Sequence, residues 1–330
     1  MKTAPKRLIY VYTLLSWILT ALALVFRVFA RVYSYDSAIG YFEAASLFPT
    51  LHYVCLALVA LLSGSALVLF RRYEIPDTVP SGMKKTCVME RIGAAVGGIS
   101  MLVLSISTAV FYYSASVLSP TGFTLFGLLT AICSVFFFLF FWVSSAVGKI
   151  LHIFSGFALV LHFVYILAAT YFELYTPMNN PVKVLLQLTA VSAILYLLSD
   201  LRFYLGIARP VRHIATSTLF LSFSTVTVLS CGMFTLLTEA HTKLYYLYCL
   251  TVFALLVPAA IRHTRMMLLW VRADRSIDSA EDDGEETSDT ERSPIETIGE
   301  QEAPMDSERI DLPTPDDLSE NNDTRQDTEE

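Results

Sequence analysis

Residues 8–30 have the sequence LIYVYTLLSWILTALALVFRVFA, which is long and apolar enough to cross a lipid bilayer as a helix. A spanning helix needs ~20 mostly apolar residues, and only helices or closed barrels satisfy their backbone groups inside lipid. Seven further runs of this kind follow. The sequence therefore predicts an all-α fold, a polytopic membrane helix bundle with eight transmembrane helices at residues 8–30, 44–70, 92–118, 123–147, 150–172, 182–206, 214–238 and 244–261.

Charge divides the chain into two parts. Hydrophobic residues make up 55% of the 330 positions, more than is usual in soluble domains. Of the 30 acidic residues, 21 follow Arg275, so residues 1–275 carry +11 and residues 276–330 carry −18. The acidic part lacks aromatic residues and cannot bury enough apolar surface to offset its ordering entropy. We expect a transmembrane domain at 1–275 and a disordered acidic tail at 276–330.

Basic residues predict the orientation of the spans. The segments on one side of the predicted membrane hold 16 Lys and Arg residues and those on the other side hold four. Positive charge concentrates on the cytoplasmic side of short loops, so both termini are expected in the cytoplasm of a multi-pass cell-membrane protein. The basic juxtamembrane segment 262–275 either extends the last helix past Pro258 or lies along the inner headgroups with Trp270 as an anchor.

The acidic tail has two possible arrangements. The inner leaflet is itself negative, so the tail is expected to be repelled into the cytoplasm. Alternatively, Glu281, Asp282 and Asp283 fold back onto the basic residues within a Debye length of ~8 Å and form an electrostatic cover. In that case an unknown cytoplasmic partner would displace the tail. The lipid bilayer is the other expected partner, and no nucleic acid is expected.

Polar residues on the fifth, sixth and seventh spans form a candidate polar pathway. An ionisable group near the middle of a span, such as His162, is a functional candidate, although a structural histidine explains it too. Asp200 ends a polar stripe on the sixth span, and it is either an interfacial ion pair that fixes depth or a coupling carboxylate. The hydroxyls of the seventh span either pack or line a hydrated path. The candidate residues are His162, Tyr165, Thr189, Ser192, Tyr196, Asp200 and Ser224.

Gly93 and Gly97 form a GxxxG pair on the third span. Small residues on one helical face let two backbones approach closely. The pair indicates helix packing, either within this chain or in a homodimer through the third span.

Signatures of known catalytic sites are lacking in the sequence. It contains no HExxH, GxSxG, Walker or CxxC motif, and no intramembrane pair of aspartates. We therefore predict no catalytic residues, metal site or cofactor, and we favour a function other than catalysis.

Two stretches resemble a family of uncharacterised multi-spanning membrane proteins of clostridial-type bacteria. One is YDSAIGYF at 35–42; the other is MNNPVK at 178–183, continuing through Gln187 to SDLRF at 199–203. The resemblance implies a bacterial cytoplasmic-membrane protein and implies no activity.

Three functions stay open, and an intramembrane enzyme is the least favoured of them because the sequence lacks a nucleophile–base or metal constellation. The first, slightly favoured, is a transporter-like protein or the membrane subunit of a transporter, with its path between the fifth, sixth and seventh spans. The alternative is a membrane sensor or assembly scaffold that signals through the acidic tail. A water-filled cavity reaching His162 and Asp200 would favour transport, and a solid apolar core would favour the scaffold.

Overall fold

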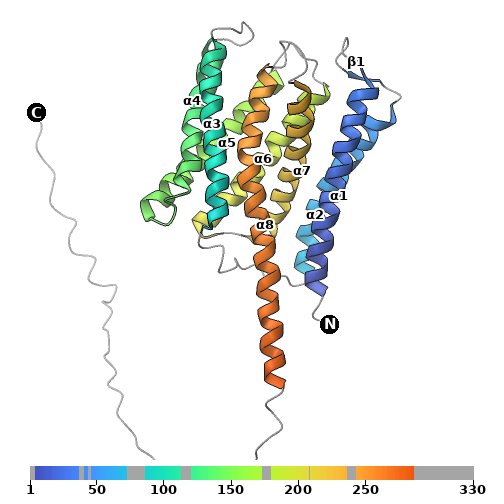
Figure 1. Cartoon of the computed structure of the whole chain (residues 1–330), viewed down its shortest axis with the longest axis vertical. Helices are drawn as coiled ribbons and strands as arrows, with labels where there is room; N and C mark the ends of the chain where they lie inside the picture. Colours follow the sequence, from blue (N-terminus) through green and yellow to red (C-terminus); the bar gives the residue numbers. More distant parts are fainter. Residues whose placement is uncertain are drawn as a thin grey trace, which may run out of the picture. The chain divides into compact units, whose positions relative to one another are not determined.

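The computed structural model describes residues 4–36, 41–43, 46–72, 86–112, 120–172, 180–207, 209–235 and 243–285. Predictions for the tail beyond Glu285 and for most of the second loop fall outside these ranges. Within them the chain forms eight helices and one hairpin (Figure 1). The elements are α1 (Ala4–Tyr33), β1 (Tyr35–Asp36), β2 (Tyr41–Phe42), α2 (Leu47–Arg72), α3 (Val88–Tyr112), α4 (Pro120–Leu139), α5 (Ala146–Phe172), α6 (Pro181–Leu205), α7 (Pro210–Thr235) and α8 (Lys243–Glu285).

Seven of these helices, all except α4, are long and apolar enough to cross a membrane. The apolar part of α4 is shorter than 18 residues, so the eighth span stays a prediction. Large apolar side chains such as Leu61, Ile106 and Phe154 are 69%, 65% and 70% exposed. Soluble proteins seldom leave extended apolar surface in water. The described helices are therefore compatible with an integral membrane protein.

The helices run alternately between two ends of the bundle (Figure 1). We call the end that carries β1 and β2 the hairpin end. The opposite end, where α2 ends, α3 begins and α8 leaves the bundle, is the charged end. Sequence neighbours pack together from α3 to α7, and α7 also contacts α1 and α2. The main apolar core joins residues of α1 to α8.

The hairpin between α1 and α2 departs from the predicted all-α fold. Its strands are antiparallel, with Tyr35 opposite Phe42 and their ring centroids 5.6 Å apart. The guanidinium of Arg31 lies 3.5 Å from the centroid of the Tyr35 ring, a cation–π contact. Strands of two residues are too short to show the alternation by which a sequence predicts them.

The fourth predicted span, 123–147, is too long. α4 ends at Leu139, and the Trp142 N–H then donates to the Leu139 carbonyl at 2.9 Å, which tightens the chain into a turn. The Ser145 hydroxyl accepts from the Gly148 N–H at 3.0 Å and caps the start of α5. Because this turn is aromatic and apolar, hydropathy does not distinguish it from a span.

The sixth predicted span, 182–206, nearly coincides with α6. The Asn180 side chain accepts from the Val182 N–H at 2.9 Å, and Pro181 takes the first position of the helix. Gly206 ends the helix with a φ of 78°, a left-handed conformation that favours glycine. These caps fix the level at which α6 presents its side chains.

α8 differs most from the sequence prediction. A span ending at Ile261 and a disordered tail from 276 were expected, but α8 is one helix from Lys243 to Glu285 that continues through Pro258. Of the two arrangements considered for residues 262–275, the structure has the extension of the last helix. Figure 1 shows α8 continuing past the ends of its neighbours.

This continuity also changes what was expected of Trp270 and the start of the tail. Trp270 is 7% exposed and packs against Phe70, with ring centroids 6.5 Å apart, so it is not an anchor among the headgroups. Glu281 and Asp282 continue α8, at least about 28 Å along its axis from Arg262 at 1.5 Å per residue. In this structure they therefore do not fold back onto Arg262, and a cover over the loop that follows Arg72 stays a prediction, because residues 73–85 and 286–330 lie outside the described ranges.

The small face of α3 packs against α8 of the same chain. A Cβ at Gly97 would lie 2.6 Å from the Ala254 carbonyl oxygen, and one at Gly93 would lie 2.7 Å from Ile261. Pro258 lacks an N–H, so the carbonyl of Ala254 loses its usual helical donor and faces this glycine instead. Homodimerisation through the same face stays a prediction, and it would require α8 to move away.

Candidate functional site

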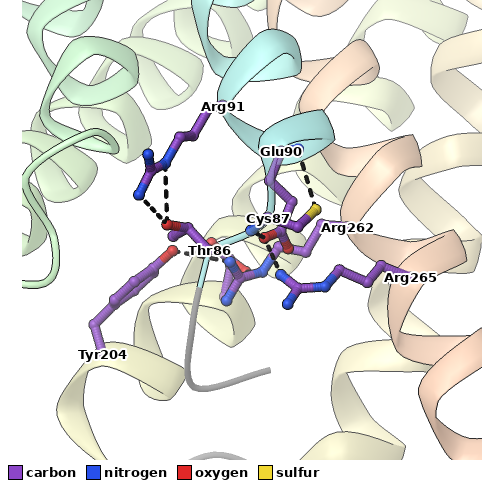
Figure 2. Close-up of polar contacts among 8 residues, drawn as sticks. Thr86, Cys87, Glu90, Arg91, Tyr204, Arg262 and Arg265 are labelled. Carbon is purple, nitrogen blue, oxygen red and sulfur yellow. Dashed lines mark hydrogen bonds and ion pairs between the residues drawn. The ribbon is translucent and has the colours of Figure 1, made fainter. Parts of the chain in front are cut away.

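Two ion pairs join α8 to α6 and α3 within the charged end of the bundle (Figure 2). In the first, Arg262 Nε of α8 lies 2.6 Å from Asp200 Oδ1 of α6. Arg262 Nη1 also donates to the Tyr204 hydroxyl at 2.9 Å. Asp200 and Arg262 are only 5% and 7% exposed. Burying a charge is costly, and losing one partner leaves the other uncompensated.

The second ion pair joins Arg265 of α8 to Glu90 of α3, with Arg265 Nη1 donating to Glu90 Oε2. The same oxygen accepts from the Cys87 N–H at 3.0 Å, and the Glu90 N–H donates to Cys87 Sγ at 3.5 Å. This reciprocal arrangement is a capping box at the start of α3. The carboxylate of Glu90 is therefore held by its own helix as well as by Arg265.

Helical spacing explains why these side chains meet. Asp200 and Tyr204 are four residues apart on α6, and Arg262 and Arg265 are three apart on α8, so each pair shares a helix face. The two carboxylates and two guanidiniums have no net formal charge, so each buried charge is compensated by an opposite one. We call Glu90, Asp200, Tyr204, Arg262 and Arg265 the charge cluster.

A small cavity of about 20 Å³ lies beside the charge cluster, lined by Glu90, Tyr196, Asp200 and Arg262 together with apolar side chains. A buried water needs roughly 10–15 Å³ and two to four polar partners. Glu90 Oε1 is buried and has no hydrogen-bond partner among the described residues. The cavity therefore has the size and the polar groups for one water molecule and is too small for a metabolite.

Tyr196 and Asp200 are the two predicted pathway residues that share this cavity. The other hydroxyls of the stripe take part in helix contacts. Thr189 Oγ1 lies 2.6 Å from Thr227 Oγ1 on α7, and Ser192 donates to the Thr189 carbonyl at 2.8 Å. Ser224 donates to the Leu221 carbonyl within α7 at 3.2 Å. The stripe thus forms part of the α6–α7 interface.

His162 and Tyr165 lie elsewhere, against Phe126 of α4. Their ring centroids are 5.0 and 6.0 Å from that of Phe126, and neither residue lines the cavity beside Asp200. His162 is fully buried, and neither ring nitrogen has a hydrogen-bond partner among the described residues. The structure therefore does not bring the histidine and the aspartate into one site.

Hydroxyls of α7 make a second polar region with α1 and α8. Thr20 Oγ1 donates to Ser222 Oγ at 2.7 Å, and Ser217 Oγ lies 2.6 Å from His263 Nδ1. In the most apolar 18-residue stretch of α7, 72% of the residues are buried, which is the largest share among the seven helices long enough to cross a membrane. Its hydroxyls therefore bond across and within helices in the bundle interior.

Sequence reasoning missed four of the five members of the charge cluster, including Arg262, the partner of Asp200. Arg262 was expected among the headgroups but is buried with Asp200, because an arginine that ends an apolar run looks like the end of a span. Glu90 was passed over at the edge of the third run. Its position three residues after Cys87 has the spacing of a capping box, a signal that could have identified it.

The site consists of two ion pairs that join α8 to α6 and α3, beside a cavity large enough for one water molecule. Among the residues that the structure describes, no three His, Cys, Asp or Glu side chains are placed to hold a metal ion.

No protein-family model, curated protein sequence or solved structure matches this chain.

Proposed function

We propose that this protein is a membrane sensor or assembly scaffold that signals through α8 and the acidic tail. The observation that carries the proposal is α8 itself. It is bound to α6 and α3 by the two ion pairs of the charge cluster and continues as one helix to Glu285. A movement of α6 or α3 would act on buried charges of α8, and a continuous helix transmits that movement along its axis.

The packing around the candidate pathway supports this choice over the transporter that the sequence slightly favoured. The cavity at Asp200 is about 20 Å³ and does not include His162. Phe163 of α5 and Leu197 of α6, two of the three helices of the expected path, belong to the buried apolar core. A water-filled cavity that reaches both His162 and Asp200 would have favoured transport. The observed packing favours the scaffold instead.

Transport is the second candidate, and one observation favours it. Asp200 lies at a cavity with room for water, next to a second carboxylate, Glu90, that has one oxygen without a hydrogen-bond partner among the described residues. Intramembrane carboxylates of this kind mark ion and proton pathways in other membrane proteins. In this reading Asp200 is the coupling carboxylate, and the structure is a closed state.

Removing the acidic tail should separate the two candidates. A chain ending at Glu285 keeps all of α8, so it should insert and accumulate normally. If the protein signals through its tail, the shortened chain should fail to reverse the metabolite and transcript changes of a deletion strain. If the protein is a transporter, the shortened chain should still reverse them. The matched control replaces residues 286–330 with a Gly-Ser chain of equal length, which should fail in the same way. Full reversal by the control would contradict the proposed function.

The orientation that goes with this proposal places the charged end in the cytoplasm of a bacterium, with both termini inside and the bundle in the cytoplasmic membrane. The 16-to-4 distribution of basic residues and the alternation of the helices support it.

Labelling of single cysteines should test this orientation. Glu43 at the hairpin end and Arg209 at the charged end are both exposed. In a cysteine-free background on whole cells, an impermeant maleimide should label Glu43→Cys at once and Arg209→Cys only after the membrane is permeabilised. The reverse order would contradict the orientation.

A further inference from the structure

We propose that a groove between α3 and α8 binds one anionic phospholipid of the leaflet at the charged end. The groove has a volume of about 490 Å³. One wall contains Met89 of α3 and Cys87, the residue before that helix, and the α8 wall contains Ile261, Thr264, Arg265 and Leu268. It opens on the outside of the charge cluster and is separate from the small cavity at Asp200.

The groove lies at the depth of lipid headgroups. The apolar span of α8 runs from Leu247 to Trp270. The other wall lies where the apolar span of α3, Val88–Thr108, begins. Arg265 pairs with Glu90, the third residue of that span, so its guanidinium lies near the end of the apolar region. Phosphate groups are found just outside the hydrocarbon core of a bilayer, within reach of this level.

Arg265 is the charged residue among the described residues that line the groove. In the Glu90–Arg265 pair the glutamate side chain is 2% exposed and the arginine side chain 18% exposed. The capping box holds the carboxylate inward, so the guanidinium is the group that reaches the groove. A guanidinium has five N–H donors in a fork that suits phosphate, and Thr264, an exposed residue with a hydroxyl, is the neighbouring residue in the chain.

The apolar walls suit the rest of a lipid molecule. Ile261 lies about one helical turn deeper than Arg265, toward the middle of the span, where an acyl chain would begin. Met89 and Leu268 are 64% and 53% exposed at the mouth. A headgroup without a second positive charge, such as that of phosphatidylglycerol, complements this site better than phosphatidylcholine, whose ammonium would meet Arg265.

Native mass spectrometry of the full chain, titrated with phosphatidylglycerol or phosphatidylcholine in detergent, would test the site. The natural chain should retain one phosphatidylglycerol in preference to phosphatidylcholine. Leu268→Trp fills the groove, and the double variant Glu90→Gln/Arg265→Gln removes the guanidinium without leaving Glu90 unpaired. Losing one cation should weaken retention about fivefold, the usual effect of a basic residue at a membrane surface.

Matched controls keep the test independent of folding. Leu195→Trp changes an exposed leucine of α6, and Arg72→Gln removes an exposed arginine at the same end of the bundle. Both should retain phosphatidylglycerol as the natural chain does. Equal retention of the two lipids, or equal effects of groove and control variants, would overturn the proposal.

Alkylation of Cys87 gives a second readout, because its side chain is partly exposed on the wall of the groove. Phosphatidylglycerol should slow the reaction of Cys87 with a maleimide, and phosphatidylcholine should not. Slow alkylation without any lipid would show that a segment of the chain fills the groove. A dimer that Leu268→Trp dissociates would show a second copy there. Either result would overturn the lipid site.

Discussion

Replacing Asp200 with asparagine is expected to destabilise the bundle by about 3–5 kcal/mol, the usual cost of removing one partner of a buried ion pair. The change leaves the guanidinium of Arg262, 7% exposed, without its counter-ion. Unfolding of purified protein by SDS, followed by circular dichroism, would measure the loss. Glu43→Gln removes an exposed carboxylate and should stay within about 0.5 kcal/mol of the natural chain.

The same variant separates two roles for Asp200. If the ion pair with Arg262 only fixes the depth of the helices, Asp200→Asn should lower the amount of folded protein and leave the activity of each remaining molecule intact. If Asp200 couples ions, the protein should accumulate normally and lose activity. Unchanged stability of Asp200→Asn relative to Glu43→Gln would contradict the buried ion pair.

Replacing Gly97 with alanine is expected to cost about 1–3 kcal/mol, the range for overpacking a well-packed interior. The added Cβ would meet the Ala254 carbonyl oxygen at 2.6 Å and the Phe137 ring at 2.8 Å. Neither a backbone carbonyl nor a buried ring moves aside cheaply, so α3 and α8 must separate. The SDS unfolding midpoint, compared with that of the natural chain, would measure this.

Gly64 supplies the matched control for this change. It lies in α2, and a Cβ added there would have nothing within 4 Å. Gly64→Ala should therefore be neutral or stabilising by up to ~1 kcal/mol, since alanine is the better helix former. Equal effects of the two substitutions would mean that α3 and α8 do not approach closely at Gly97.

Hydropathy predicted most of the helices because its signal is local. The first predicted span lies within α1, and α6 agrees with its prediction to one residue at each end. Asn180, Pro181 and Gly206 act within a few residues of where they stand, so their effect can be read from sequence alone. The aromatic turn after Leu139 gave no such signal.

The candidate site was harder to predict because its residues come from three helices. Asp200 was recognised as unusual, but its partner Arg262 follows it by 62 positions and ends an apolar run, where arginine ordinarily reaches the headgroups. Whether such an arginine is buried depends on whether a neighbouring helix places a carboxylate beside it. That information is in the packing of α6 against α8 and not in the local sequence.

His162 shows the opposite case. Its position in the middle of a span made it either a functional group or a structural histidine, and the structure places it in an apolar environment next to Phe126. Depth along a helix can be read from sequence, but the neighbours at that depth cannot. A lone histidine in a span therefore predicts a function only when a second polar group is known to face it.

The central claim, that a buried ion pair ties α8 to the bundle, is tested most directly by a double-mutant cycle on Asp200 and Arg262. The unfolding free energy would be measured for Asp200→Asn, Arg262→Gln and the double variant. Each single variant should lose about 3–5 kcal/mol, and the double variant should recover much of that loss because no charge is left unpaired. Losses that simply add in the double variant would show that the two side chains do not interact, and would contradict the role given to α8.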